Sequence, residues 1–224
     1  MGGNPTKGRF GDFVECLDKA REEGMKVTVH CGEVDNVEEV REIVRWRPDR
    51  LGHFLKVPEE IWGEMEEVRL SEERSDENHT RSYFRTRRAF SVITSIFLTP
   101  YPNPFRDLLR SSQEIPIEIC PTSNIMTLNL PNLSSHPTLR RLVEGGYPVS
   151  INTDDCGVFS TTQSQELYMV AREMGLNEYT ISGIVWGAVD LVFEGNRRVR
   201  ARLARDVMKG IKGRLERLEM EDKA

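Results

Sequence analysis

The sequence predicts an α/β fold with parallel strands, and two observations support this prediction. Patterns in which apolar residues recur every three or four positions alternate along the chain with short β-branched runs, as helices alternate with buried strands. Polar residues suited to chemistry directly follow several of these runs. Parallel strands need a helical crossover between them, and they place functional groups at their carboxyl ends. Both observations therefore indicate the same fold class.

The first elements are predicted to be a helix, a strand, a helix and a second strand. Apolar residues recur at helical spacing over residues 7–24, and Gly24 stands where a C-terminal cap belongs. Residues 26–30 (KVTVH) form a short β-branched run that is typical of a buried strand. The next amphipathic pattern ends at Pro48, because proline cannot continue a helix, and residues 50–53 (RLGH) are predicted to form another strand-to-loop junction.

The later elements repeat the same two patterns. They are a helix over residues 58–68, strands over residues 115–120 (IPIEIC) and 149–152 (VSIN), and helices over residues 137–143, 167–174 and 181–191.

Residues 71–113 interrupt this alternation. The segment holds seven arginines and no lysine, with scattered serine, threonine and proline. Connections in α/β units usually run about 2–6 residues, so a structureless stretch of this length is unusual inside a compact domain. We expect it to be either a disordered insertion or sequence that is not genuinely coding.

Composition and charge narrow the class of protein. A chain of 224 residues with 38% hydrophobic and 30% charged residues suits a single domain over residues 1–224. The net charge of -5 predicts no nucleic-acid or membrane partner and favours a small-molecule substrate. No apolar run approaches the roughly 20 residues of a membrane span and no signal peptide is visible, so a cytoplasmic location is expected. The four cysteines form no CxxC pair, which indicates reduced thiols.

Five polar residues at three predicted strand ends form the candidate site: His30, Glu33, His53, Asp154 and Asp155. A neutral imidazole and a carboxylate are suitable ligands for Zn²⁺, which lowers the pKa of a bound water towards ~7. A second carboxylate can transfer a proton, and a second histidine can hold or deprotonate the water. Hydrolytic deamination needs these functions.

Each of these residues also has an ordinary structural interpretation. A single histidine at a strand end is more often a core or loop residue than a ligand. The pair Asp154 and Asp155 is more often a turn or a helix cap than a metal site. His136 followed by Pro137 is interpreted as the start of a capped helix. The conjunction at neighbouring strand ends, and not any single residue, therefore favours a catalytic site.

Four strings in this order resemble the signatures of the adenosine deaminase family: TVHCGEV (28–34), DRLGH (49–53), EICPTSN (118–124) and SINTDD (150–155). Two further strings, GGNPTKGRF (2–10) and DDCGVFSTTQSQE (154–166), are similar to the adenosine deaminase-like branch, which hydrolyses N6-methyl-AMP and related nucleotides. Classical adenosine deaminases have proline after the paired aspartates, where this chain has Cys156. The likeness covers nearly the whole chain except residues 71–113.

The resemblance implies a TIM-type (β/α)8 barrel with Zn²⁺ at its mouth, of which this chain holds roughly the C-terminal half, strands 5–8 with their helices and further C-terminal helices. It implies deamination at purine C6 of N6-methyl-AMP, AMP or adenosine, with IMP or inosine and an amine or ammonia as products. The implied roles are as follows: His30 and Asp154 ligate zinc, Glu33 protonates purine N1, His53 orients and deprotonates the attacking water, Asp154 also accepts a hydrogen bond from that water, Asp155 holds purine N7, and the backbone N–H of Gly3 meets N3.

The sequence departs from the family at its start. Family members carry an HxH pair that supplies two further zinc ligands, and this sequence has no HxH. Only His30 and Asp154 remain, below the three protein ligands of an ordinary catalytic zinc site. We therefore expect weak zinc binding and a true N-terminus further upstream. Two alternatives stay open: a catalytically inactive half-barrel that serves as an interaction module, and another metal-dependent hydrolase on a similar barrel.

Overall fold

The computed structural model describes residues 4, 6–65 and 114–221. The chain forms two compact units, residues 1–58 with 115–224, and residues 59–114. In the second unit residues 59–65 are helical, which agrees with the start of the helix predicted over residues 58–68. The anomalous segment 71–113 and Gly3 lie outside the described residues.

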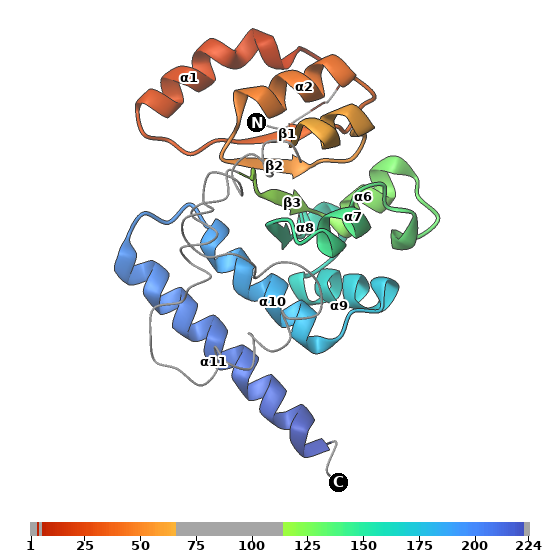
Figure 1. The fold of residues 1–224 in the computed structure, drawn as a ribbon, viewed down its shortest axis with the longest axis vertical. Helices are drawn as coiled ribbons and strands as arrows, with labels where there is room; N and C mark the ends of the chain where they lie inside the picture. The colour runs from red at the N-terminus through yellow and green to blue at the C-terminus, as the bar shows by residue number, and fades with distance from the viewer. Residues whose placement is uncertain (1–3, 5, 66–113, 222–224) are drawn as a thin grey trace. The chain divides into compact units, whose positions relative to one another are not determined.

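The first unit contains the sheet and most of the helices that the structure describes (Figure 1). Its elements are, in chain order, η1 (Phe10–Phe13), α1 (Val14–Glu22), β1 (Thr28–Cys31), α2 (Val37–Trp46), β2 (Arg50–His53), β3 (Ile117–Ile119), α6 (Pro121–Leu128), η2 (Leu133–Ser135), α7 (Leu139–Glu144), β4 (Val149–Ile151), α8 (Cys156–Phe159), α9 (Gln163–Met174), α10 (Glu178–Ala188), η3 (Val189–Leu191) and α11 (Arg197–Glu221).

The four strands form one parallel sheet in the order β1-β2-β3-β4. α2 packs against β1, while α9 and α10 contact β4. Each pair of neighbouring strands is connected through helical segments or, between β2 and β3, through the second unit. The predicted α/β class with parallel strands is therefore confirmed.

Register divides the sheet into an apolar face and a polar face. Residues in register on neighbouring parallel strands share a face, and successive residues alternate between faces. One row consists of the buried residues Val29, Leu51, Ile117 and Val149, each at most 5% exposed. The adjacent row consists of His30, Gly52, Glu118 and Ser150. Parallel strands are usually apolar on both faces, so this polar row is unusual. His53 is in register with Cys31 and so belongs to a different row, but it stands at the end of β2 with a left-handed backbone (φ +65°) and lines the same cavity as His30.

Local sequence explains where the helices begin and end. The side chain of Asn36 caps α2 by accepting a hydrogen bond from the Glu39 amide (3.2 Å), and Asn177 caps α10 in the same way through the Thr180 amide (2.9 Å). Gly24 follows the C-cap of α1 with φ +82°, as the sequence predicted for a glycine at this position.

Two helices differ from the prediction. The helix predicted over residues 137–143 begins only at Leu139, with Thr138 as its N-cap, so Pro137 is not its first residue. The predicted elements include no helix between the strand over residues 115–120 and residue 137, but Pro121–Leu128 is the helix α6. Its weakly amphipathic sequence explains why it is not visible as a pattern, while Pro121 suits the first helical turn because no N–H partner is needed there.

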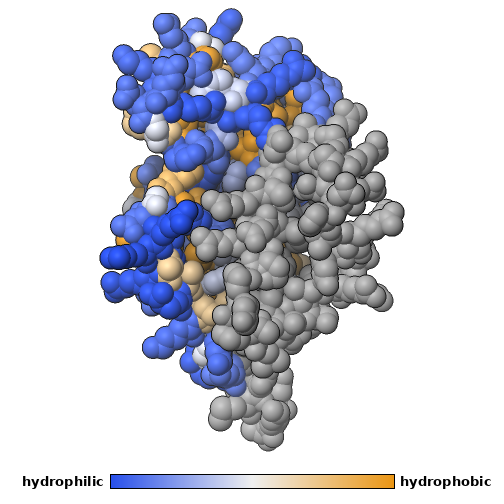
Figure 2. Space-filling view, turned by 60° about the vertical axis from the view of Figure 1, so that its left-hand side comes forward, coloured by the Kyte–Doolittle hydropathy of each residue, from blue (hydrophilic) through white to orange (hydrophobic). Residues whose placement is uncertain are grey.

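The described helices include none that joins the length and the apolar character of a membrane span, even though α11 has 25 residues. On the face seen in Figure 2, hydrophilic residues cover most of the described surface, and hydrophobic residues form patches between them.

Candidate active site

A cavity of about 260 Å³ lies at the carboxyl ends of the strands. It contains three of the residues that the sequence singled out, together with other polar residues: its lining consists of His30, Gly52, His53, Glu118, Cys120, Asn152, Thr153 and Asp154. A larger cavity of about 400 Å³ lies beside α9, and no histidine is among its described lining residues. The smaller cavity is therefore the one equipped for metal binding and proton transfer.

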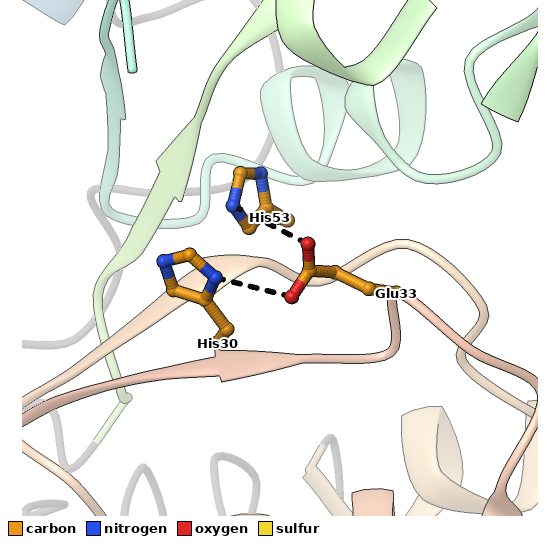
Figure 3. Close-up of side chains that lie close together, drawn as sticks. All are labelled: His30, Glu33 and His53. Carbon is orange, nitrogen blue, oxygen red and sulfur yellow. Dashed lines mark hydrogen bonds and ion pairs between the residues drawn. The ribbon is translucent and has the colours of Figure 1, made fainter. Parts of the chain in front are cut away.

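Glu33 joins the two histidines of the site, as Figure 3 shows. Its Oε2 lies 3.1 Å from Nδ1 of His30, and its Oε1 lies 3.9 Å from Nε2 of His53. The two imidazole rings meet edge to face, with their centroids 4.4 Å apart. The loop directly after β1 places Glu33 three residues beyond His30, so one short segment brings an imidazole and a carboxylate to the same place.

Asp154 follows β4, at the opposite edge of the sheet from β1, and its side chain lies near His53. Its Oδ2 lies 3.8 Å from Nε2 of His53. Both residues have a left-handed backbone, with φ +55° for Asp154 and φ +65° for His53. Non-glycine residues rarely adopt this conformation, and it concentrates at functional sites because the surrounding structure must hold it.

Gly52 makes room for the ring of His30. A Cβ atom at Gly52 would lie 2.9 Å from Cδ2 of His30, closer than real Cβ contacts. The two residues are partners in the β1–β2 register, so only glycine lets the imidazole lie across the neighbouring strand.

Burial and charge set the protonation of the central pair. Burial raises the pKa of Glu33, but the hydrogen bond with His30 and the charges of His53 and His30 lower it more, so the net pKa lies below its usual value. Burial and the charge of His30 lower the pKa of His53, against the opposing effect of Glu33 and Asp154. At neutral pH the site therefore holds a neutral His53 and an ionised Glu33.

The donor atoms suit a metal ion in type and spacing. Two triplets have ligand atoms within 4.8 Å of one another, His30 with Glu33 and His53, and His53 with Cys120 and Asp154. Neutral imidazole and carboxylate are preferred by Zn²⁺, whereas burial raises the pKa of the Cys120 thiol and disfavours the thiolate that a metal would need. The imidazole and carboxylate groups of the described residues therefore match the ligand types that Zn²⁺ takes in proteins.

Asp155 does not join the residues that line the cavity. It is the N-cap residue of α8, and its backbone carbonyl accepts hydrogen bonds from the amides of Val158 and Phe159. Asp155 thus has the position of a helix cap, but its side chain makes no capping hydrogen bond.

The polar row of the sheet adds a network that the sequence analysis did not identify. Glu118 accepts a hydrogen bond from Thr28 Oγ1 (3.1 Å) and forms an ion pair with Arg50 (2.9 Å). A signal was present in the sequence, because Glu118 is the one charged residue in the apolar run of residues 115–120. Its partners come from two other strands, however, so the pairing is visible only once the sheet is formed.

Comparisons with known proteins agree with this geometry. The sequence profile of the adenosine deaminase family matches residues 3–209. The chain is 32% identical over 177 residues to the adenosine deaminase-like protein of Drosophila melanogaster, covering 79% of this chain and 39% of that protein. It is 26% identical over 193 residues to the N6-mAMP deaminase of Arabidopsis thaliana, covering 86% of this chain and 41% of that protein.

A solved structure supports the same relation. The crystal structure of Arabidopsis ADAL complexed with IMP aligns with a TM-score of 0.69 and 25% identity, over 95% of this chain and 48% of that chain. The chain thus spans about half the length of the relatives it matches, and the parallel sheet agrees with the expected part of a TIM-type barrel. The resemblance seen in the four sequence motifs is confirmed: the chain belongs to the adenosine deaminase family, in its adenosine deaminase-like branch.

Proposed function

We propose that this chain provides the catalytic face of a zinc-dependent deaminase that hydrolyses the 6-amino or 6-alkylamino group of a purine nucleotide or nucleoside. The substrates are N6-methyl-AMP, AMP or adenosine, and the products are IMP or inosine with an amine or ammonia. The observation that supports this function best is the meeting of His30, His53 and Asp154 around one cavity at the strand ends, with the carboxylate of Glu33 facing both histidines.

His30 and Asp154 are the proposed protein ligands of the metal. Both line the cavity, and His30 uses Nδ1 for Glu33, which leaves its Nε2 for a ligand role. When bound, Zn²⁺ supplies a water of lowered pKa and so a nucleophile at neutral pH.

Glu33 is the proposed proton carrier to purine N1. Its lowered pKa means that the carboxylate starts ionised and accepts a proton before it donates one to the ring. His53 is placed to hold the attacking oxygen, because its Nε2 faces both Glu33 and Asp154. The proposed contacts of Asp155 with N7 and of the Gly3 amide with N3 follow from the family resemblance.

A nucleotide is the favoured substrate class. Relatives are named for N6-mAMP, and a solved neighbour is complexed with IMP. A phosphate needs backbone N–H groups or a cation, and Lys7, Arg9, Thr122 and Ser123 carry such groups in segments next to the strands. The Thr122 amide already donates to Glu166 Oε2 (2.9 Å), however, and Ser123 is buried. The exposed Lys7 and Arg9 are therefore the better candidates.

The test is hydrolysis of N6-methyl-AMP, AMP and adenosine in the presence of Zn²⁺. It is done with the chain alone and with the N-terminal half of the Arabidopsis N6-mAMP deaminase supplied as a second polypeptide, because the chain spans about half of that protein. We expect zinc-dependent release of methylamine, which disappears in His30→Ala and Asp154→Ala. No release in either arm would instead support a catalytically inactive half-barrel.

A further inference from the structure

Three buried polar side chains, His53, Asn124 and His136, form a hydrogen-bonded row. The row begins at Nδ1 of His53, whereas Nε2 of the same ring faces Glu33 and Asp154. Nδ1 of His53 lies 2.9 Å from Nδ2 of Asn124, and Oδ1 of Asn124 lies 3.1 Å from Nε2 of His136. The three residues are 3%, 0% and 6% exposed, so solvent does not compete for these hydrogen bonds. Buried polar groups of this kind depend on one another for satisfaction.

The backbone fixes the direction of these hydrogen bonds. Nδ1 of His136 accepts from the amides of Thr138 (3.3 Å) and Leu139 (3.0 Å). A backbone N–H can only donate, so Nδ1 of His136 carries no proton and the neutral ring is protonated at Nε2.

The protonation of His136 determines the direction of the next two hydrogen bonds, up to His53. Nε2–H of His136 donates to Oδ1 of Asn124, which leaves the amide nitrogen of Asn124 to donate to Nδ1 of His53. The orientation of an asparagine amide is normally an assignment, but here the two backbone amides at the far end determine it. A neutral His53 then holds its own proton on Nε2, which faces Glu33 and Asp154.

Two further features keep this row in place. Burial, with a smaller contribution from the charge of His53, lowers the pKa of His136 to about 4, so the ring stays neutral at physiological pH. The Thr138 hydroxyl donates to the backbone carbonyl of Phe54 (2.8 Å), which ties the start of α7 to the residue after His53.

We propose that Asn124 and His136 are positioning residues that impose the Nε2–H tautomer on His53. Under the proposed function, His53 in this form donates a hydrogen bond to an oxygen in the cavity. It cannot remove a proton through Nε2 while neutral, so the deprotonating part of the role expected from the family falls to another group. The tautomer itself does not depend on the proposed function.

The experiment is long-range ¹H–¹⁵N correlation spectroscopy of the metal-free chain labelled with ¹⁵N-histidine, with signals assigned by single-histidine substitutions. In the wild type we expect His53 and His136 both protonated at Nε2 and not at Nδ1. Asn124→Asp replaces the donor with a group that only accepts, so His53 should gain a proton on Nδ1. Asn129→Asp makes the same chemical change at the exposed C-cap of the same helix and should leave His53 unchanged.

A second pair of variants covers the case in which Asn124→Asp does not fold. His136→Phe removes the donor to Asn124 and frees its amide to rotate, so His53 should show both tautomers. His136→Gln restores an N–H donor and should restore the single Nε2–H form. A wild-type His53 protonated at Nδ1, or an Nε2–H form that persists in both Asn124→Asp and His136→Phe, overturns the proposal. Because neither metal nor substrate is present, these outcomes are independent of whether the chain is a deaminase.

Discussion

At the residue scale, Glu33 lies between the two histidines of the candidate site. Each of its carboxylate oxygens faces a different imidazole, 3.1 Å from His30 and 3.9 Å from His53. The hydrogen bond with His30 orients the carboxylate through Oε2. It leaves Oε1, which faces Nε2 of His53, available. This geometry suits a group that moves a proton and does not itself need to bind metal.

Changing Glu33 to Gln tests this role. The amide keeps the shape of the side chain but cannot carry a proton, so turnover should fall by about 10²–10⁴-fold, the usual contribution of a general acid or base. Zinc content should stay close to that of the wild type. Both are measured in the two-polypeptide assay, by amine release and by metal analysis. Glu38→Gln, at an exposed position in the first turn of α2, is the matched control. Unchanged turnover in Glu33→Gln removes this residue from the mechanism.

The four cysteines should differ sharply in reactivity. Cys16 and Cys156 are exposed, whereas Cys31 and Cys120 are buried. Burial raises the pKa of both buried thiols well above the usual value, and the charges of Glu39 beside Cys31 and of Asp154 beside Cys120 act in the same direction. The thiolate is the reactive form, so alkylation of the native chain near pH 8 should label the exposed pair first.

Mass spectrometry of peptides from briefly alkylated chain measures this difference. Denatured chain is the control and should label at all four positions. Rapid labelling of Cys120 in native chain would mean that solvent reaches this thiol at the cavity lining. That result would contradict its burial in the structure.

At the scale of elements, the strands illustrate both the strength and the limit of sequence patterns. Short β-branched runs predicted β1 and β4 to within two residues, because buried strands favour β-branched apolar residues and so leave a direct trace in the sequence. α6 left no such trace, since threonine, serine and asparagine are weak helix formers and its contacts with α9 are non-local. Helix α6 carries Asn124, which lies between His53 and His136 in the buried row.

Changing Gly52 to Ala tests the fit between β1 and β2. The new methyl group would lie 2.9 Å from Cδ2 of His30, so the ring must move away from the neighbouring strand. We expect zinc affinity to fall by about 10–100-fold, as when a metal ligand loses its support. Overpacking should also lower the free energy of unfolding by about 1–3 kcal/mol.

Zinc titration and urea unfolding measure the two effects of Gly52→Ala. Gly183→Ala is the matched control, since nothing lies within 4 Å of the added atom and the residue is inside α10. There the same substitution should raise stability by roughly 0.5–1 kcal/mol through helix propensity. Zinc binding by Gly52→Ala equal to that of the wild type would show that His30 is not a ligand or that β1 and β2 yield easily.

At the scale of the whole molecule, the sequence predicted the class of fold and the residues that follow strand ends, because these depend on local patterns. His30, Glu33, His53 and Asp154 follow strand ends in the sequence, and the sheet places His30, His53 and Asp154 around one cavity, with Glu33 facing both histidines. The connection from His53 to Asn124 and His136 was not found, because it joins residues up to 83 positions apart through contacts that no local pattern encodes. The sequence favours a helix start for His136, and its Nδ1 does accept from the Thr138 and Leu139 amides, but its Nε2 donates to Asn124.

The free energy of unfolding of the whole chain should fall as the solution becomes acidic. His136 defines the pH range of this effect most clearly. Its pKa is lowered to about 4 in the folded state, against an ordinary value of 6.5. Between these two values the unfolded chain binds more protons than the folded chain, so the free energy of unfolding rises with pH in this range. The stabilisation is fully present above pH 6.5 and is lost as the pH falls towards 4. A difference of this size corresponds to about 3 kcal/mol at most.

The lowered pKa values of His53 and Glu33 act in the same direction, so His136 must be separated by substitution. Urea unfolding at pH 7, 5.5 and 4.5 gives the dependence for the wild type and for His136→Gln, whose side chain keeps a donor and an acceptor but does not titrate. The variant should lose less stability than the wild type between pH 7 and pH 4.5, with the difference concentrated below pH 6.5. Parallel curves for the two proteins would mean that His136 is protonated as readily in the folded chain as in the unfolded one. The hydrogen bonds from the Thr138 and Leu139 amides to its Nδ1 would then not persist in solution.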